Sequence, residues 1–361
     1  MEVLSKMLES TYDLKEGKTS WRSPSNIALI KYWGKYADQI PANPSLSFSL
    51  KNSFSETSIA YRLKKKADEI SLDFLFEGKE NPAFKARLEK FINGIHPYFS
   101  FLSNFHLTID SKNSFPHSSG IASSASAMSA LVLNLMDMYN ELTGSAMDKE
   151  TFFRASSYFS RLASGSAARS VYGGYTVWGE SEHFTGSSDL YAVRIDESID
   201  PIFQSLHDDV LIIEKGAKKV SSSAGHALMN NHPFGQARFE LARKRMGEIK
   251  SILTSGDLNA FGELIESEAL ILHAMMMASR PYFILFRPNT LAVMEKIWEI
   301  RGSTGLQIYF TLDAGANIHL IYPEEIKTVV STTIKDHFLA YCENATYLRD
   351  GIGSGPVNLR I

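Results

Sequence analysis

Hydrophobic and polar residues form short segments with strand character and longer segments with helical character. Residues 55–63 and 69–76 alternate or run apolar, and they contain many β-branched and aromatic side chains, as strands do. The same reasoning predicts further strands at 27–30, 105–110, 190–195, 209–214, 306–312, 317–322 and 344–348, and one after Gly173-Gly174. Predicted helices follow the turn at 77–82 up to about 94 and cover about 118–143, 148–163, 222–254, 257–278, 289–301 and 323–341.

This mixture of short strands and long helices predicts an α+β or α/β fold. The chain has 361 residues, which is too many for one ordinary core, so we expect two domains. Residues 189–201 combine a predicted strand with a polar turn, and they are the expected crossing between the halves. We therefore predict one domain at 1–197 and a second at 198–361.

Composition narrows the range of functions. Hydrophobic residues make up 44% and charged residues 21% of the chain, and the net charge of −3 gives no reason to expect a nucleic-acid partner. The single cysteine, Cys342, excludes an internal disulfide framework and a cysteine-rich metal site. Residues 1–20 lack the apolar segment of a signal peptide, and no apolar run approaches the roughly 20 residues that span a bilayer. We expect a cytoplasmic protein with no membrane partner.

The segment 113–127 is rich in serine and alanine and leads into a long apolar run at 128–139. Small side chains at 118–127 let a phosphate group approach the backbone closely, and the serine hydroxyls can donate to it or hold a metal ion. If a helix begins here, its free N–H groups and the positive end of its dipole face the loop. This is not a Walker motif, because no Gly-Lys-Ser/Thr follows. A helix start packed under other helices is the alternative.

Three charged residues have two possible interpretations: each faces a cleft, or each has an ordinary structural role. Lys31 follows the apolar run 27–30, Arg169 follows Ser164-Gly165-Ser166, and Asp313 ends the predicted strand 306–312. Taken singly, each fits a structural role: a lysine that extends to solvent from a strand end, an arginine on a flexible loop and an aspartate in a turn.

Together and in this order, however, the motifs resemble a known family. Pro-x-x-x-Gly-Ile-x-Ser-Ser-Ala at 116–125 resembles the phosphate-binding loop of the GHMP kinases. Four further strings closely resemble the mevalonate diphosphate decarboxylases of that superfamily: Lys-Tyr-Trp-Gly-Lys at 31–35, Ser-Gly-Ser-Ala-Ala-Arg-Ser at 164–170, Val-Ser-Ser at 220–222 and Asp-Ala-Gly-Ala-Asn at 313–317. The resemblance extends over about 22–322. It implies a two-domain GHMP kinase fold, with the active site in the cleft between the domains, and commonly a homodimer.

The resemblance also implies a role for each matching residue. Lys31 would face the carboxylate or phosphate of the substrate, and Asp313 would lie beside its 3-hydroxyl. The catalytic residues would be Asp313, Lys31, Arg169 and Ser166. Substrate contacts would come from Tyr32 and Lys35 on the diphosphate, from Arg169 on the carboxylate, and from Ser164, Ser166, Ser221 and Ser222. ATP and Mg²⁺ would be held by Ser118, Ser119, Gly120, Ser123 and Ser124, with Ser124 as the metal ligand. We match no residue at 79–90 to the arginine that commonly helps the family to bind the diphosphate.

The implied chemistry suits these residue types. A 3-hydroxy acid does not readily lose CO₂, because hydroxide is a poor leaving group. Phosphorylation of the hydroxyl by ATP creates a better one, whose departure draws electrons from the bond to the carboxylate. The expected function is therefore ATP-dependent decarboxylation of mevalonate 5-diphosphate to isopentenyl diphosphate, a step of isoprenoid biosynthesis. Two alternatives stay open: a mevalonate 3-kinase of the same superfamily and a mevalonate 5-phosphate decarboxylase.

Overall fold

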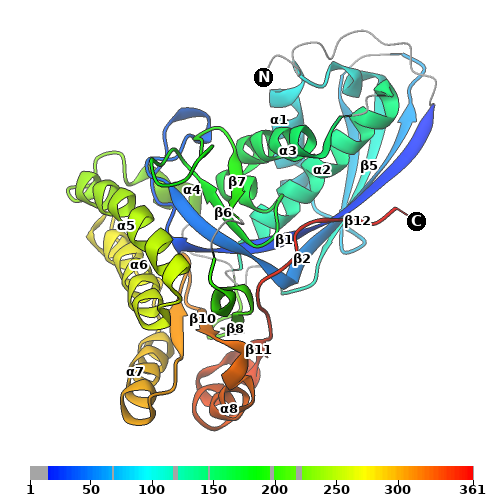
Figure 1. The fold of residues 1–361 in the computed structure, drawn as a ribbon. Coiled ribbons are helices and arrows are strands. Elements are labelled where there is room, and N and C mark those ends of the chain that lie inside the picture. The colour runs from blue at the N-terminus through cyan, green and yellow to red at the C-terminus, as the bar shows by residue number, and fades with distance from the viewer. Residues whose placement is uncertain are drawn as a thin grey trace.

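Two β-sheets and the helices packed on them make up the fold of this computed structural model (Figure 1). It describes residues 15–66, 69–116, 121–144, 147–195, 199–216 and 222–360. Within these residues the larger sheet has the order β12-β1-β2-β5-β3-β4, with β6 paired to both β2 and β7. Its strands are β1 (Glu16–Ile30), β2 (Ser45–Leu63), β3 (Ser71–Phe76), β4 (Lys79–Glu80), β5 (Phe105–Asn113), β6 (Tyr175–Trp178), β7 (Ala192–Ile195) and β12 (Val357–Asn358). Strands β3 and β5 are parallel, and the other pairs are antiparallel.

Three helices cover one face of the larger sheet: α1 (Pro82–Ile95), α2 (Ser123–Thr143) and α3 (Lys149–Ala163) (Figure 1). Helix α2 is apolar around most of its circumference, and most of its residues are buried between the sheet and α3. A helix of this composition is stable only in a core. Strand β1 (Glu16–Ile30) holds the residues directly before this helix, because Ser25 Oγ donates to the carbonyl of Ile121 at 2.6 Å.

The second sheet is antiparallel and has the order β11-β8-β10-β9. Its strands are β8 (His207–Leu211), β9 (Tyr309–Thr311), β10 (Ile318–Tyr322) and β11 (Tyr347–Leu348). The helices of this half are α4 (Ser222–Ala227), α5 (Gly235–Ser255), α6 (Leu258–Ala278), α7 (Pro288–Thr304) and α8 (Lys327–Thr333). One hydrophobic core joins the end of β1 and the start of β2 to α5, α6 and β8, so the two halves share buried surface. The arrangement confirms the predicted α+β fold.

Several predicted elements have other bounds in the structure; the strand expected at 27–30, for example, begins at Glu16. The helix expected at 118–143 begins at Ser123, and its N-cap residue Ala122 has a left-handed backbone with φ 41°. The helix expected at 222–254 is two helices, α4 and α5; between them lies Pro233, which lacks a backbone N–H and disfavours helix at the residue before it. Strand β2, predicted only at 55–63, begins at Ser45; there Ser47 Oγ lies 2.9 Å from Thr176 Oγ1. Buried serines bonded to neighbouring strands conceal the hydrophobic pattern of a strand.

The C-terminal segment returns to the larger sheet, where β12 pairs with β1 (Figure 1). On the way, Ser49 Oγ donates to the carbonyl of Gly353 at 2.9 Å. The domain boundary between 197 and 198 stays a prediction, and the structure adds that the last described strand belongs to the sheet of the first half.

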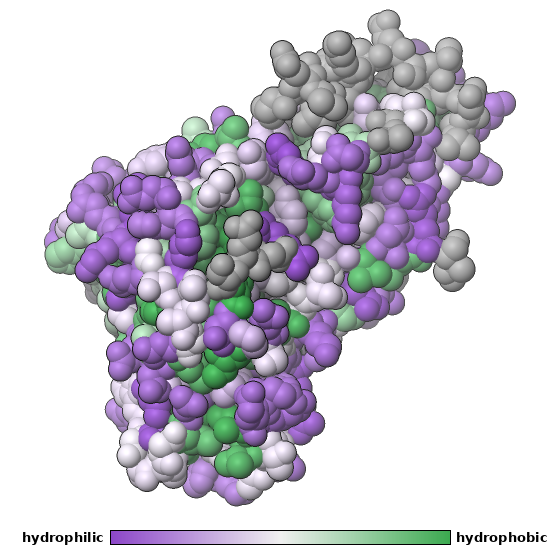
Figure 2. Space-filling model, in the orientation of Figure 1, coloured by the Kyte–Doolittle hydropathy of each residue, from purple (hydrophilic) through white to green (hydrophobic). Residues whose placement is uncertain are grey.

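Hydrophilic residues cover most of the face drawn in Figure 2, and hydrophobic residues show there as separate small groups. Among the described residues, no helix has both the length and the apolar character needed to cross a membrane.

Close packing of α6 on β9 leads to a stability prediction. A Cβ added to Gly262 of α6 would lie 1.8 Å from Cδ1 of Tyr309, so Gly262→Ala should force the helix and strand apart. We expect the free energy of unfolding to fall by about 1–3 kcal/mol, as overpacked cores do. Gly302→Ala in α7 is the matched control, because its Cβ would meet nothing within 4 Å; it should be neutral or stabilising. Urea unfolding of both variants checks this, and equal stability would contradict it.

Candidate active site

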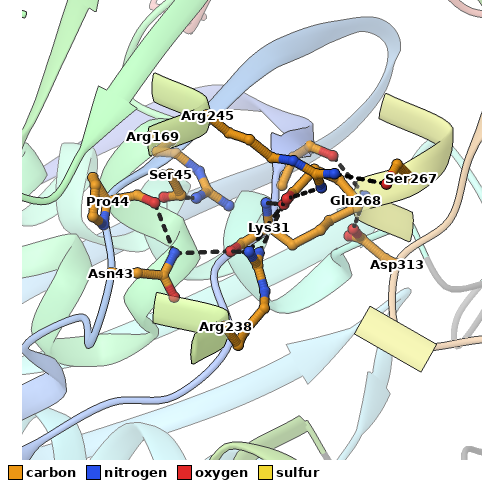
Figure 3. A network of polar contacts seen from close by, with 11 residues as sticks. Lys31, Asn43, Pro44, Ser45, Arg169, Arg238, Arg245, Ser267, Glu268 and Asp313 are labelled. Carbon is orange, nitrogen blue, oxygen red and sulfur yellow. Dashed lines mark hydrogen bonds and ion pairs between the residues drawn. The ribbon is translucent and has the colours of Figure 1, made fainter. Parts of the chain in front are cut away.

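The backbone of Lys31, directly after β1, is fixed from three directions. Its N–H donates to Oε2 of Glu268 at 2.8 Å, and its carbonyl accepts from Asn43 Nδ2 at 3.0 Å and from Arg238 Nη2 at 3.1 Å. Strand β1 thus delivers the lysine at a point where α5 and α6 meet the larger sheet (Figure 3).

Glu268 on α6 is the centre of this network (Figure 3). Its side chain is fully buried and accepts hydrogen bonds from Arg238 at 2.7 and 3.2 Å and from Arg245 at 2.6 Å, both on α5. A buried carboxylate is tolerated when it is paired and fully hydrogen-bonded. The charges of α5 and α6 therefore hold the strand end that carries Lys31.

The side chain of Lys31 pairs with Asp313, the second residue after β9. Nζ lies 3.1 Å from Oδ1 of Asp313 and also donates to the carbonyl of Ala28 at 2.6 Å. Burial lowers the pKa of Lys31, and the Asp313 carboxylate opposes this shift. The Asp313 side chain keeps about a quarter of its surface exposed, and Nε2 of His273 lies 3.1 Å from its carbonyl oxygen. Asp313 is thus held by its backbone while its carboxylate stays accessible.

Arg169 ends a 3₁₀ turn at Gly165–Arg169 and is buried. Its Nε donates to Asn26 Oδ1 at 3.1 Å, and its Nη1 donates to Ser45 Oγ at 2.5 Å. Within the described part of the chain no carboxylate forms an ion pair with it, and burial lowers its pKa to about 10. A buried cation without a counter-ion favours an anionic ligand.

These side chains surround one cavity of about 270 Å³. Eight of the predicted site residues line it: Lys31, Tyr32, Lys35, Ser124, Ser164, Ser166, Arg169 and Asp313. Ser124 Oγ lies 3.4 Å from Ser164 Oγ, so the start of α2 meets the end of α3 here. Ser123, by contrast, is the first residue of α2 and does not line the cavity. The predictions for Ser118, Ser119, Gly120 and Ser221 lie outside the described residues, and Ser222 is the first residue of α4.

Comparison with known proteins identifies the family. Residues 23–192 match the model of the diphosphomevalonate decarboxylase-like N-terminal domain, and residues 209–354 match the mevalonate 5-diphosphate decarboxylase C-terminal domain. The chain belongs to the diphosphomevalonate decarboxylase family.

Individual members of this family align over most of the chain. The diphosphomevalonate decarboxylase of Debaryomyces hansenii is 28% identical over 335 residues, which are 89% of this chain and 83% of the relative. The phosphomevalonate decarboxylase of Haloferax volcanii is 26% identical over 85% of this chain and 89% of its own length. The crystal structure of the Staphylococcus aureus mevalonate diphosphate decarboxylase superposes with a TM-score of 0.81 at 27% identity, covering 96% of this chain and 98% of that one. A structure named "MDDEF in complex with MVAPP, AMPPCP and Magnesium" gives 0.80 at 26% identity, covering 96% and 100%. These likenesses confirm the predicted two-domain fold.

The decarboxylase motifs did not reveal every residue of the cavity. Arg87 on α1 and His226 on α4 also line it, as does Gln39, whose Oε1 accepts from Lys35 Nζ at 2.7 Å. Arg87 lies within 79–90, where the family commonly has an arginine. Nothing in the sequence of helix α1 indicates that the side chain of Arg87 faces the cavity. Glu268 could not be identified from the sequence. Within α6, a buried glutamate that pairs with distant arginines looks the same as a solvent-exposed glutamate.

The buried network yields a prediction for Glu268→Gln. The amide keeps the shape of the carboxylate but leaves Arg238 and Arg245 without a negative partner. We expect the free energy of unfolding to fall by about 3–5 kcal/mol, the range for breaking a buried ion pair from one side. Glu299→Gln removes a carboxylate from a surface pair with Lys296 and should leave the unfolding midpoint unchanged. Urea unfolding that shows equal losses in both variants would refute the central role of Glu268.

Proposed function

We propose that the protein catalyses ATP-dependent decarboxylation of mevalonate 5-diphosphate to isopentenyl diphosphate, a step of the mevalonate pathway. The observation that carries the proposal is the placement of Lys31, Asp313 and Arg169 around one cavity. Phosphorylation and decarboxylation of a 3-hydroxy acid require a carboxylate beside an ammonium group, and a guanidinium that no described carboxylate pairs with. Family membership and the likeness to a structure holding MVAPP, AMPPCP and magnesium support the same reaction.

In the first step Asp313 accepts the proton of the 3-hydroxyl while that oxygen attacks the γ-phosphorus of ATP, and the bond from this phosphorus to the leaving oxygen of ADP breaks. General-base catalysis of this kind contributes about 10²–10⁴-fold to the rate. The ammonium group of Lys31 stabilises the ionised form of Asp313 and supplies positive charge near the transferring phosphoryl group.

In the second step Arg169 orients the carboxylate. The C3–O bond breaks and phosphate leaves with the electron pair, while the electrons of the C1–C2 bond form the C2=C3 double bond and CO₂ departs. The hydrogen bonds from Arg169 to Asn26 and Ser45 fix the guanidinium before substrate binds. A planar guanidinium pairs with a carboxylate through two parallel bonds, so it controls the direction of the C1–C2 bond.

Lys35 and Arg87 suit the diphosphate end of the substrate. Both line the cavity, and neither forms an ion pair with a carboxylate among the described residues. Burial and the nearby charge of Arg87 lower the pKa of Lys35, so an anion placed between these cations would relieve their repulsion. Tyr32 lines the cavity beside them, and its buried hydroxyl has no hydrogen-bond partner among the described residues.

The hydroxyl groups at the start of α2 suit the nucleotide end. No cluster of three histidine, cysteine or acidic side chains that would form a metal site occurs in the described residues. Mg²⁺ commonly takes few protein ligands and several phosphate oxygens, a pattern that the Ser124 hydroxyl fits. When bound there, Mg²⁺ would neutralise phosphate charge during transfer. The role of Ser118, Ser119, Gly120 and Ser123 in ATP binding, and of Ser164, Ser166, Ser221 and Ser222 in substrate binding, is part of this proposal.

We also propose a homodimer and a cytoplasmic location. The family resemblance supports the first. The single cysteine, Cys342, is buried and unpaired, as expected for a protein of a reducing compartment.

Turnover assays test the function directly. ATP is supplied with mevalonate, its 5-phosphate or its 5-diphosphate, and ADP and CO₂ are measured together. We expect equal amounts of both products, with the 5-diphosphate as the preferred substrate. Release of ADP without CO₂ would identify a 3-hydroxyl kinase, and preference for the 5-phosphate would identify a mevalonate 5-phosphate decarboxylase.

Asp313→Asn separates chemistry from binding. The amide keeps the shape of the side chain but cannot accept the proton, so kcat should fall at least about 100-fold, the lower end for loss of a general base. ADP and CO₂ release should fall together, because phosphorylation precedes decarboxylation, while the KM values for ATP and substrate stay near normal. Asp336→Asn, at an exposed position, is the control. Full activity of Asp313→Asn would make this aspartate a turn residue.

A further inference from the structure

His226 belongs to α4 in the second half of the chain but packs on the loop that follows β1. Nδ1 accepts a hydrogen bond from the N–H of Gly34 at 3.0 Å. The imidazole packs on two neighbouring rings, with centroids 4.2 Å from Tyr32 and 4.6 Å from Trp33. Gly225 permits this approach, because a Cβ there would lie 2.5 Å from Cη2 of Trp33. The orientation of the ring is therefore fixed.

This geometry also determines where the proton of the ring lies. A nitrogen that accepts a hydrogen bond carries no hydrogen, so in the neutral ring the proton is on Nε2. Burial, together with the positive charges of Lys35 and Arg169, lowers the pKa of His226 to about 3. The ring is consequently neutral at physiological pH, and its Nε2–H is a permanent donor.

This donor has no acceptor in the described part of the protein. His226 as a whole residue is only 7% exposed, and its Nε2 forms no hydrogen bond with a described residue. Its free surface lies on the cavity that Lys35 and Arg87 also line. Because Nδ1 is occupied by Gly34, the Nε2–H is the polar group of this ring that is available to an acceptor on a ligand bound in the cavity.

We propose that His226 binds the phosphate end of the substrate as a neutral N–H donor supplied by the second half of the chain. The identity of the substrate as a phosphorylated mevalonate rests on the proposed function. Of the two cations that act on His226, Lys35 has the larger effect, and Lys35 is the residue assigned to the phosphate groups. A further cation at this position would repel Lys35 and Arg87, whereas a neutral N–H adds a hydrogen bond without adding charge. The bound phosphate would then connect α4 with the loop after β1.

Two substitutions separate this role from a structural one. His226→Asn keeps an acceptor near the Nδ1 position for Gly34 but has no donor at the Nε2 position, whereas His226→Gln can reach the Nε2 position with its amide N–H. We expect His226→Asn to raise the KM for mevalonate 5-diphosphate about tenfold, equivalent to about 1.4 kcal/mol, with the KM for ATP and kcat unchanged. His226→Gln should recover most of the loss. A merely structural residue would give the reverse order, and that result would overturn the proposal.

A second measurement does not depend on turnover. In the full chain labelled with ¹⁵N-histidine, the resonances of His226 are assigned by their loss in His226→Asn. At neutral pH they should show a proton on Nε2 alone, and the Nε2 resonance should shift when inorganic pyrophosphate is added. A ring protonated on both nitrogens, or one that does not respond to pyrophosphate, would refute the inference. Failure of wild-type protein to release CO₂ from the 5-diphosphate would instead refute the proposed function.

Discussion

The site depends on one buried carboxylate, that of Glu268. Its oxygens bind two arginines of α5 and the backbone N–H of Lys31, and the carbonyl of Lys31 is bonded to Arg238 in turn. Charged groups in a protein interior are strongly unfavourable unless they are paired. A shift of α6 relative to the end of β1 would leave the buried N–H of Lys31 without its acceptor, and a shift of α5 relative to α6 would leave a buried charge without its partner. The network therefore sets the relative position of the two halves, and with it the distance between Lys31 and Asp313.

The positions of Lys31, Arg169 and Asp313 illustrate how far sequence alone leads. Each had an ordinary structural explanation, and only the order of the motifs suggested that they belong together; the structure brings all three to one cavity. Strongly periodic segments such as α3 and α6 lay close to their predicted bounds, because their apolar faces are determined locally. The roles of Lys31, Arg169 and Asp313 in the reaction remain proposals.

What the sequence did not reveal depends on contacts between distant residues. Glu268 contacts Lys31 across 237 positions, and His226 contacts Gly34 across 192. No pattern within α6 or α4 announces such a partner. The serines of β2 show the same limit: Ser47 and Ser49 look like loop residues, yet they are buried and hydrogen-bonded to β6 and to the C-terminal segment. Polar groups are buried where the fold supplies hydrogen-bond partners, and a local sequence pattern does not show those partners.

The cavity concentrates positive charge in a protein whose net charge is −3. Lys31, Lys35, Arg87 and Arg169 line it, and Asp313 is the one carboxylate among its described lining residues. Burial lowers the pKa of Lys31, Lys35 and Arg169, which means that the free protein holds these cations at an energetic disadvantage relative to the unfolded chain. The disadvantage is present at every pH at which the groups are protonated in the folded state.

A polyanionic ligand reduces this disadvantage by pairing with the cations, so part of the binding energy is relief of repulsion already present in the fold. By the same linkage, such a ligand stabilises the folded protein by an amount that grows with the logarithm of its concentration relative to Kd. A neutral donor such as the Nε2–H of His226 suits this cavity better than a further cation. It adds a hydrogen bond to a phosphate without increasing the repulsion among the four cations.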